Sequence, residues 1–140
     1  MYLQNTDHQK WLESAIAELE AVAGTIHVQR ETTLHLTAAH HIPVSVLTII
    51  TRVAFGKGMP GQAQARKAAV QPCDLLTEAE LQAPSKPTTA QACIAVPLLD
   101  AHEQVLAVIG FAWHIPGDIG EAQQQRILAK VQEFATHIKH

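Results

Sequence analysis

The sequence predicts one α+β domain across residues 1–140, with a core from about 11 to 138, in which helices at both ends flank an antiparallel sheet. The chain has 140 residues and 47% are apolar, which is enough for one hydrophobic core. Near both termini, apolar residues recur at three- and four-residue steps, the period of an amphipathic helix. Segments between them have the two-residue period of half-buried strands, with polar connectors of hairpin length.

An amphipathic helix is predicted from Asp7 to Ala23. Its apolar positions are Trp11, Leu12, Ala15, Ile16, Leu19, Val22 and Ala23. Charged residues occupy other positions, so one face of the helix is suited to packing on a core. Gly24 is predicted to end the helix, because glycine adopts a left-handed backbone conformation without a Cβ clash.

Three strands are predicted next. Thr25–Gln29 and Leu34–Thr37 alternate polar and apolar residues, and the polar segment 30–33 between them indicates a hairpin. Residues Val44–Val53 are rich in β-branched side chains, which favour strands, so this segment is predicted as a third strand.

A sharp turn and a short helix are predicted in the middle of the chain. The turn is Phe55–Gly58 and the helix is Pro60–Lys67. Residues 68–71 predict a short strand. The segment 72–89 contains three prolines and predicts a loop that is long enough to cover a ligand.

The C-terminal half predicts a second hairpin and a closing helix. Cys93–Leu99 and Gln104–Trp113 are strongly apolar and are joined by the polar connector 100–103, so they are predicted as the central strands. A helix is predicted to start at 116–118, where Pro, Gly and Asp occur together. Its apolar stripe comprises Ile119, Ala122, Ile127, Val131, Phe134 and Ile138.

Composition argues against several classes of partner. The formal net charge is −3 and the longest basic run is Arg66-Lys67, so binding to nucleic acid is not predicted. No apolar run approaches the roughly 20 residues of a membrane helix, and the N-terminus is polar, so a cytoplasmic protein that does not bind membranes is predicted. Two cysteines, Cys73 and Cys93, lack the number and spacing of a structural zinc site and are predicted to be reduced thiols.

Three short motifs carry a resemblance to a known family. Residues 56–63, Gly-Lys-Gly-Met-Pro-Gly-Gln-Ala, are similar to a glycine turn that leads into a helix, and Asp74-Leu75 follow it. Residues 94–100 and 105–110 are similar to a pair of apolar strands, the first containing Val-Pro-Leu. In this order the motifs resemble the GAF domain family, and the chain resembles a free-standing single GAF domain. The resemblance implies an α/β sandwich with both terminal helices on one sheet face and short helices and loops over a ligand face.

Strand alternation predicts the character of that ligand face. On the last strand, Val108, Gly110 and Ala112 share one face, which is small, and the other face is bulkier and consists of Ala107, Ile109, Phe111 and Trp113. The small face leaves room for a cavity, whereas the bulky face suits packing under the terminal helices. The predicted ligand-binding residues are Met59, Gln62, Cys73, Asp74, Cys93, Ala95, Gly110 and Ala112. The resemblance and this lining predict a sensory domain for a small uncharged or apolar molecule. The alternative is that the middle helices fill the space, in which case the domain has no ligand cavity and serves as a scaffold.

A thiol-dependent redox enzyme is a second hypothesis. Some free-standing GAF proteins reduce free methionine sulfoxide with a cysteine in the glycine turn and with acidic residues on the sheet. In this chain Pro60 stands in the turn position, and Cys93, Gly110 and Ala112 stand in the acidic positions. No Arg, Lys or His adjoins either cysteine in sequence to lower a thiol pKa. The chain is therefore predicted not to be an enzyme, and no cofactor is identified.

Nine histidines raise the possibility of a metal site. His27 and His35 could face one another across the first hairpin, with His40 and His41 nearby. No helical His-x-x-x-His motif or convergent carboxylate accompanies them. An exposed polar face is predicted instead, with no metal ligands.

A homodimer is predicted through the terminal helices Trp11–Val22 and Ile119–Ile138. Their apolar stripes offer more surface than one seam against a sheet requires, and a twofold helical bundle would bury the remainder. A ligand that shifts the middle loop could then change how these helices pack in the dimer. A ligand-free dimerisation module is the third hypothesis.

Overall fold

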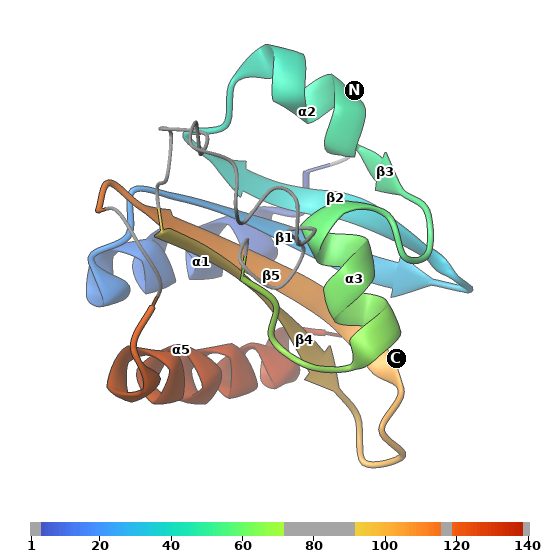
Figure 1. The fold of residues 1–140 in the computed structure, drawn as a ribbon. Helices are drawn as coiled ribbons and strands as arrows, with labels where there is room; N and C mark the ends of the chain where they lie inside the picture. Colours follow the sequence, from blue (N-terminus) through green and yellow to red (C-terminus); the bar gives the residue numbers. More distant parts are fainter. Residues whose placement is uncertain (1–3, 72–91, 116–118, 139–140) are drawn as a thin grey trace, which may run out of the picture.

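A five-stranded antiparallel sheet forms the centre of the molecule in the computed structural model (Figure 1). The structure describes residues 4–71, 92–115 and 119–138. Its elements are α1 (Thr6–Leu19), β1 (Ala23–Arg30), β2 (Thr33–His40), α2 (Val44–Ile50), β3 (Arg52–Val53), α3 (Gly58–Arg66), β4 (Ala92–Leu99), β5 (Val105–Trp113), α5 (Glu121–Glu133) and the 3-10 helix η2 (Phe134–His137). The strands lie in the order β3-β2-β1-β5-β4, and each neighbouring pair is antiparallel. The predicted α+β fold is confirmed.

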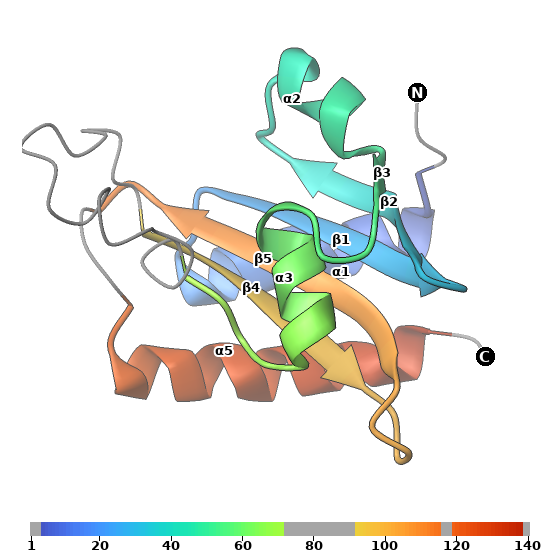
Figure 2. The same cartoon turned by 45° about the vertical axis from the view of Figure 1, so that its right-hand side comes forward.

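The two faces of the sheet carry different helices (Figure 2). Helices α1 and α5 cover one face, where Ile109, Phe111 and Trp113 of β5 are buried among their side chains. Helix α3 covers the other face, where Val108 is buried with Ala63. The Trp113 indole Nε1 also donates to the Leu19 carbonyl oxygen at 3.0 Å, which ties β5 to the end of α1. The prediction that the bulky face of the last strand packs under the terminal helices is confirmed.

The first helix ends earlier than its periodicity predicts. Asn5 caps its start by accepting a hydrogen bond from the His8 amide, and Glu20, in the left-handed conformation with φ 58°, ends it. Ala23 and Gly24 already belong to β1, so the prediction that Gly24 ends the helix is wrong. Gly24 is instead a point of close approach, since a Cβ there would lie 3.0 Å from both the Gly110 carbonyl oxygen and Leu12 Cδ1.

The segment predicted as the third strand is mostly helical. Residues Val44–Ile50 form α2, and the strand is reduced to Arg52–Val53, so the prediction is wrong over most of its length. Pro43 starts the helix, and the Thr51 hydroxyl donates to the Leu47 carbonyl oxygen within it at 2.8 Å. Helix α2 stands beyond the edge of the sheet and contains no buried residue (Figure 1). The exposed fractions of Val44 and Ile49 reach 72% and 76%.

The remaining elements follow the predictions with shifted bounds. Helix α3 starts at Gly58 rather than at residue 60, and the strand predicted at 68–71 is a single bridge between Val70 and Ala95. The loop predicted at 72–89 and the helix start predicted at 116–118 lie outside the described residues. The second hairpin is confirmed as β4 and β5, and its connector is held by Asp100, whose carboxylate accepts from the amides of residues 102 and 104. Helix α5 begins at Glu121.

The apolar stripes of the terminal helices are buried within one chain. Trp11, Leu12 and Ile16 of α1 pack in the same cluster as Ile127 and the following residues of the closing helix. Most of each stripe is therefore used within the monomer, with Ala122 exposed and Val22 and Ile138 half-buried, and the homodimer stays a prediction. None of the helices in the described ranges is both long and apolar enough to span a bilayer.

Candidate functional site

An apolar pocket lies between the sheet and the start of α3. Its volume is about 170 Å³. It is lined by Ala23, Gly24, Thr25, Ile42, Met59, Pro60, Cys93, Ile94, Ala95, Gly110, Phe111 and Ala112. No charged side chain of the described residues lines it, so the pocket offers no counter-charge to an ionised ligand.

Small residues from three strands make room for the pocket. On β5, Gly110 pairs with Thr25 on one side and with Ala95 on the other, and Ala112 pairs with Ala23 and Cys93 in the same way. Side chains directly opposite one another in a sheet point to the same face, so these residues form a shallow strip across β1, β5 and β4. Met59 and Pro60 of α3 close one side of the hollow.

The structure brings most of the predicted ligand-binding residues together. Met59, Cys93, Ala95, Gly110 and Ala112 all line the pocket. Gln62 does not line it, since its amide nitrogen donates to the Gly56 carbonyl oxygen at 2.7 Å and its amide oxygen accepts from Arg66. Gln62 therefore braces the turn before α3, and its role at a ligand stays a prediction.

Two of the predicted site residues, Cys73 and Asp74, lie outside the described residues. Seven lining residues are absent from the predicted set: Ala23, Gly24, Thr25, Ile42, Pro60, Ile94 and Phe111. Ala23 was assigned to the first helix, and Ile42 precedes a segment that was assigned to a strand. Alternation along Thr25–Gln29 is the signal that could have found Thr25, since it assigns this residue to one face of its strand. The pairing with Gly110 shows that this face is the small one.

Two polar side chains reach the pocket, those of Thr25 and Cys93. Within the described part of the chain the Thr25 hydroxyl makes no hydrogen bond. The Cys93 thiol donates to the Met59 thioether sulfur at 3.7 Å. Burial raises the pKa of the Cys93 thiol, so at neutral pH it is protonated and weakly nucleophilic. The pocket is therefore uncharged as well as apolar.

Comparison with solved structures establishes the fold. No protein-family model matches the chain, and no curated protein sequence does. The GAF domain of an Acinetobacter phosphoenolpyruvate-protein phosphotransferase aligns with a TM-score of 0.64 at 13% identity, covering 90% of this chain and 77% of that one. A GAF domain/HD domain protein from Geobacter sulfurreducens aligns with a TM-score of 0.64 at 15% identity, covering 94% and 91%. The chain has the GAF-domain fold.

A further solved structure extends the likeness to an enzyme. The type II free methionine-R-sulfoxide reductase from Thermoplasma acidophilum aligns with a TM-score of 0.69 at 12% identity, covering 94% of this chain and 89% of that one. Both GAF domains of other proteins and a reductase therefore share the fold of this chain. At such low identity the likeness establishes the fold, and the site itself has to distinguish between functions.

His27 lies on the pocket face of the sheet, contrary to the prediction of an exposed histidine face. It is 1% exposed, because the C-terminal end of α2 covers it and its Nε2–H donates to the Ile50 carbonyl oxygen at 2.8 Å. Burial lowers the pKa of His27, so it stays neutral, and its Nδ1 has no partner among the described residues. The strand register sets His27 opposite Leu36 and His35 opposite Val28. Within the described ranges no three His, Cys, Asp or Glu side chains are grouped to hold a metal.

Cys93 is expected to be a slow nucleophile in the folded domain. In a Cys73→Ser background, the alkylation rate of Cys93 by iodoacetamide should rise with pH with a midpoint above that of the same protein in denaturant, because burial raises its pKa. Mass spectrometry of quenched samples at several pH values measures the rate. The Cys93→Ser variant, which cannot be alkylated, is the control for other sites. Alkylation at pH 7 that is faster in the folded protein than in the unfolded one would contradict this assignment.

Proposed function

We propose that this GAF domain is a sensory module that binds a small, uncharged and largely apolar molecule in the pocket between α3 and strands β1, β4 and β5. The single observation that supports it best is a hollow of about 170 Å³ without a charged lining residue among those described. Apolar pockets with a few polar groups are the usual form of small-molecule sites. Occupancy would be passed on to the terminal helices.

Two strands support this route from the pocket to the helices. The backbone of Gly24 lines the pocket, and its other side lies so close to α1 that an added Cβ would meet Leu12 and Ile16 at 3.0 and 3.1 Å. Phe111 also lines the pocket, and it belongs to the cluster that contains Ile127 and Phe134. A ligand that prefers one position of β1 and β5 would therefore shift the packing of both terminal helices.

Xenon is a suitable first probe, since it binds dry apolar cavities without hydrogen bonds. In amide NMR spectra recorded under xenon, we expect shifts at Gly24, Gly110 and Ala112 and smaller shifts along α1. Ala112→Leu, which fills the pocket, should abolish them, whereas Ala129→Leu on the exposed face of α5 should leave them unchanged. An unaltered spectrum of the wild type, or equal shifts in the Ala112→Leu variant, would count against the proposal. Native mass spectrometry of protein purified without additives would show whether a molecule is retained.

A thiol-dependent reductase is the second candidate, favoured by the likeness to the Thermoplasma acidophilum protein. In such a reaction two thiols of this chain, Cys73 and Cys93, would lose two electrons and two protons, the sulfoxide oxygen would leave as water, and a disulfide would form. The raised pKa of Cys93 opposes the first step. The assay is methionine formation from free methionine-R-sulfoxide with dithiothreitol as the reductant. The sensory proposal expects none, and turnover that both Cys→Ser variants abolish would establish the reductase.

A further inference from the structure

The size of the pocket restricts what it can hold, provided that the proposed ligand site is correct. Its volume is about 170 Å³. An engineered apolar cavity of about 150 Å³ accommodates one benzene molecule or xenon. The pocket therefore matches a single six-membered ring with one small substituent.

The polar groups of the pocket restrict the ligand's charge and hydrogen bonding. The hydroxyl of Thr25 is both a donor and an acceptor, and it makes no hydrogen bond within the described part of the chain. It lies close to Gly110, since a Cβ at that glycine would be 3.1 Å from Thr25 Oγ1. No charged side chain of the described residues lines the pocket, so an ionised ligand would lose its hydration without compensation. One neutral hydrogen-bonding substituent suits this environment.

The remaining lining favours a flat aromatic ring. Gly110 and Ala112 leave a shallow surface on the sheet, against which a planar ring can lie in full contact. The Met59 thioether closes one side, and the Cys93 thiol holds it there by donating to its sulfur at 3.7 Å. Thioether sulfurs make favourable contacts with aromatic rings.

From these features together we infer that the pocket binds a neutral monocyclic aromatic molecule with one hydroxyl group, a simple phenol. The hydroxyl bonds to Thr25 Oγ1, and the ring lies on Gly110 and Ala112 beside the sulfur of Met59. The inference rests on the proposed function and narrows it to a ligand class.

The test compares four probes of similar size by NMR titration: phenol, benzene, cyclohexanol and benzoate. One added hydrogen bond should make phenol bind about 2- to 12-fold more tightly than benzene. The sulfur contact should favour phenol over cyclohexanol by a similar factor, about 2- to 12-fold. Benzoate, which is charged, should show no saturable shift.

Variants then assign each preference to its side chain. Thr25→Val should remove the preference for phenol over benzene and leave benzene binding unchanged, whereas Thr33→Val, a half-buried strand threonine outside the pocket, should change neither. Met59→Leu should reduce the preference for phenol over cyclohexanol. If xenon and benzene bind but phenol is not preferred, or if Thr25→Val has no effect on the preference, the phenol assignment is wrong. The proposal of a site for apolar molecules is then still supported. If xenon and all four probes fail to bind, the proposed function is wrong as well.

Discussion

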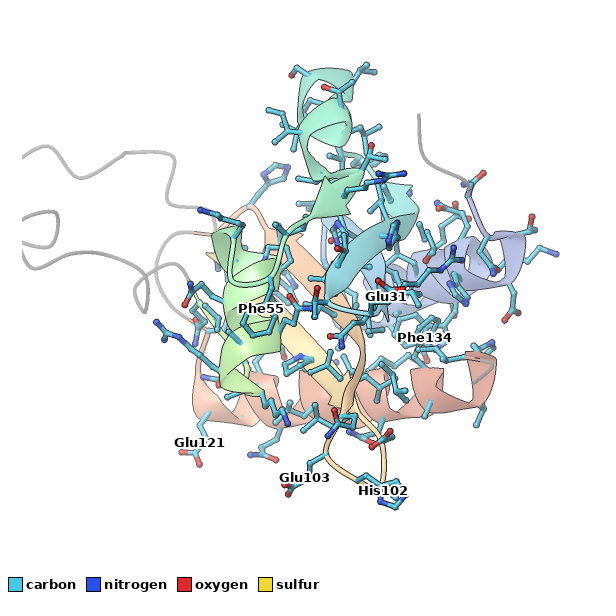
Figure 3. All side chains as sticks on the ribbon, turned by 90° about the vertical axis from the view of Figure 1, so that its right-hand side faces the viewer. Glu31, Phe55, His102, Glu103, Glu121 and Phe134 are labelled. Atoms are coloured by element: carbon cyan, nitrogen blue, oxygen red, sulfur yellow. The ribbon has the colours of Figure 1, made fainter. Side chains whose placement is uncertain are left out.

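Replacement of Phe134 with alanine is expected to lower the free energy of unfolding by about 3–5 kcal/mol, the usual cost of removing a buried phenylalanine ring. Phe134 is 0% exposed and lies where η2 meets α1 (Figure 3). Its ring centroid is 4.9 Å from that of His8, in an edge-to-face arrangement, and 4.7 Å from that of Trp11. Alanine would leave a cavity between the two terminal helices, which chemical denaturation monitored by circular dichroism would measure as a lower midpoint.

Phe55 provides the matched control for this substitution. It is 57% exposed, on the turn before α3 and far from Phe134 (Figure 3). Phe55→Ala removes the same atoms from the surface, so the change in unfolding free energy should stay within about 0.5 kcal/mol. Equal losses of unfolding free energy in the two variants would mean that Phe134 is not a core residue of the domain.

Replacement of Gly61 with alanine is expected to destabilise the domain by about 1–3 kcal/mol, although alanine is the better helix former. Gly61 lies in the first turn of α3, where a Cβ would be 2.8 Å from the Gly56 carbonyl carbon and 3.0 Å from the Ala54 carbonyl oxygen. Both neighbours are backbone atoms, so the helix and the turn have to separate. Since Met59 and Pro60 line the pocket from the same turn, the xenon-induced amide shifts should also weaken.

Ala65→Gly is the control in the same helix. Ala65 is exposed, so this change should cost about 1 kcal/mol through helix propensity alone. Helix propensity alone predicts that Gly61→Ala raises the free energy of unfolding and that Ala65→Gly lowers it, whereas the close approach at Gly61 predicts that both substitutions lower it. A stabilised Gly61→Ala variant would refute the tight packing of the turn against α3.

The C-terminal half of the fold was predictable because its signals are local. The strands β4 and β5 are joined by a short connector, and small and bulky residues alternate from Ile109 to Trp113 of β5. Alternation alone therefore separates Gly110 and Ala112 from Phe111 and Trp113, and with them the pocket face from the helix face. Four of the eight predicted ligand residues, Cys93, Ala95, Gly110 and Ala112, line the pocket from these strands, and Met59 lines it from α3.

The N-terminal half was harder to predict because its structure depends on distant partners. Ala23 fits the helical period of the preceding residues and Gly24 fits a helix end, and only pairing with Ala112 and Phe111 of β5 makes them a strand. The β-branched run at 44–50 favours a strand, yet it forms a helix after Pro43 that lies beyond the edge of the sheet (Figure 1). His27 is buried because the end of that helix covers it, which alternation along β1 does not indicate.

The lack of buried residues in α2 has a kinetic consequence for ligand exchange. Unwinding of this helix would uncover His27 and the half-buried Ile50 and would break the hydrogen bond between them, but it would leave the core cluster under the terminal helices in place, so local opening costs less than global unfolding. Ile42, a wall of the pocket, directly precedes Pro43 at the start of α2. For a molecule in the proposed site we therefore expect the residence time to follow the opening rate of this one short surface helix, while the sheet and both terminal helices stay folded.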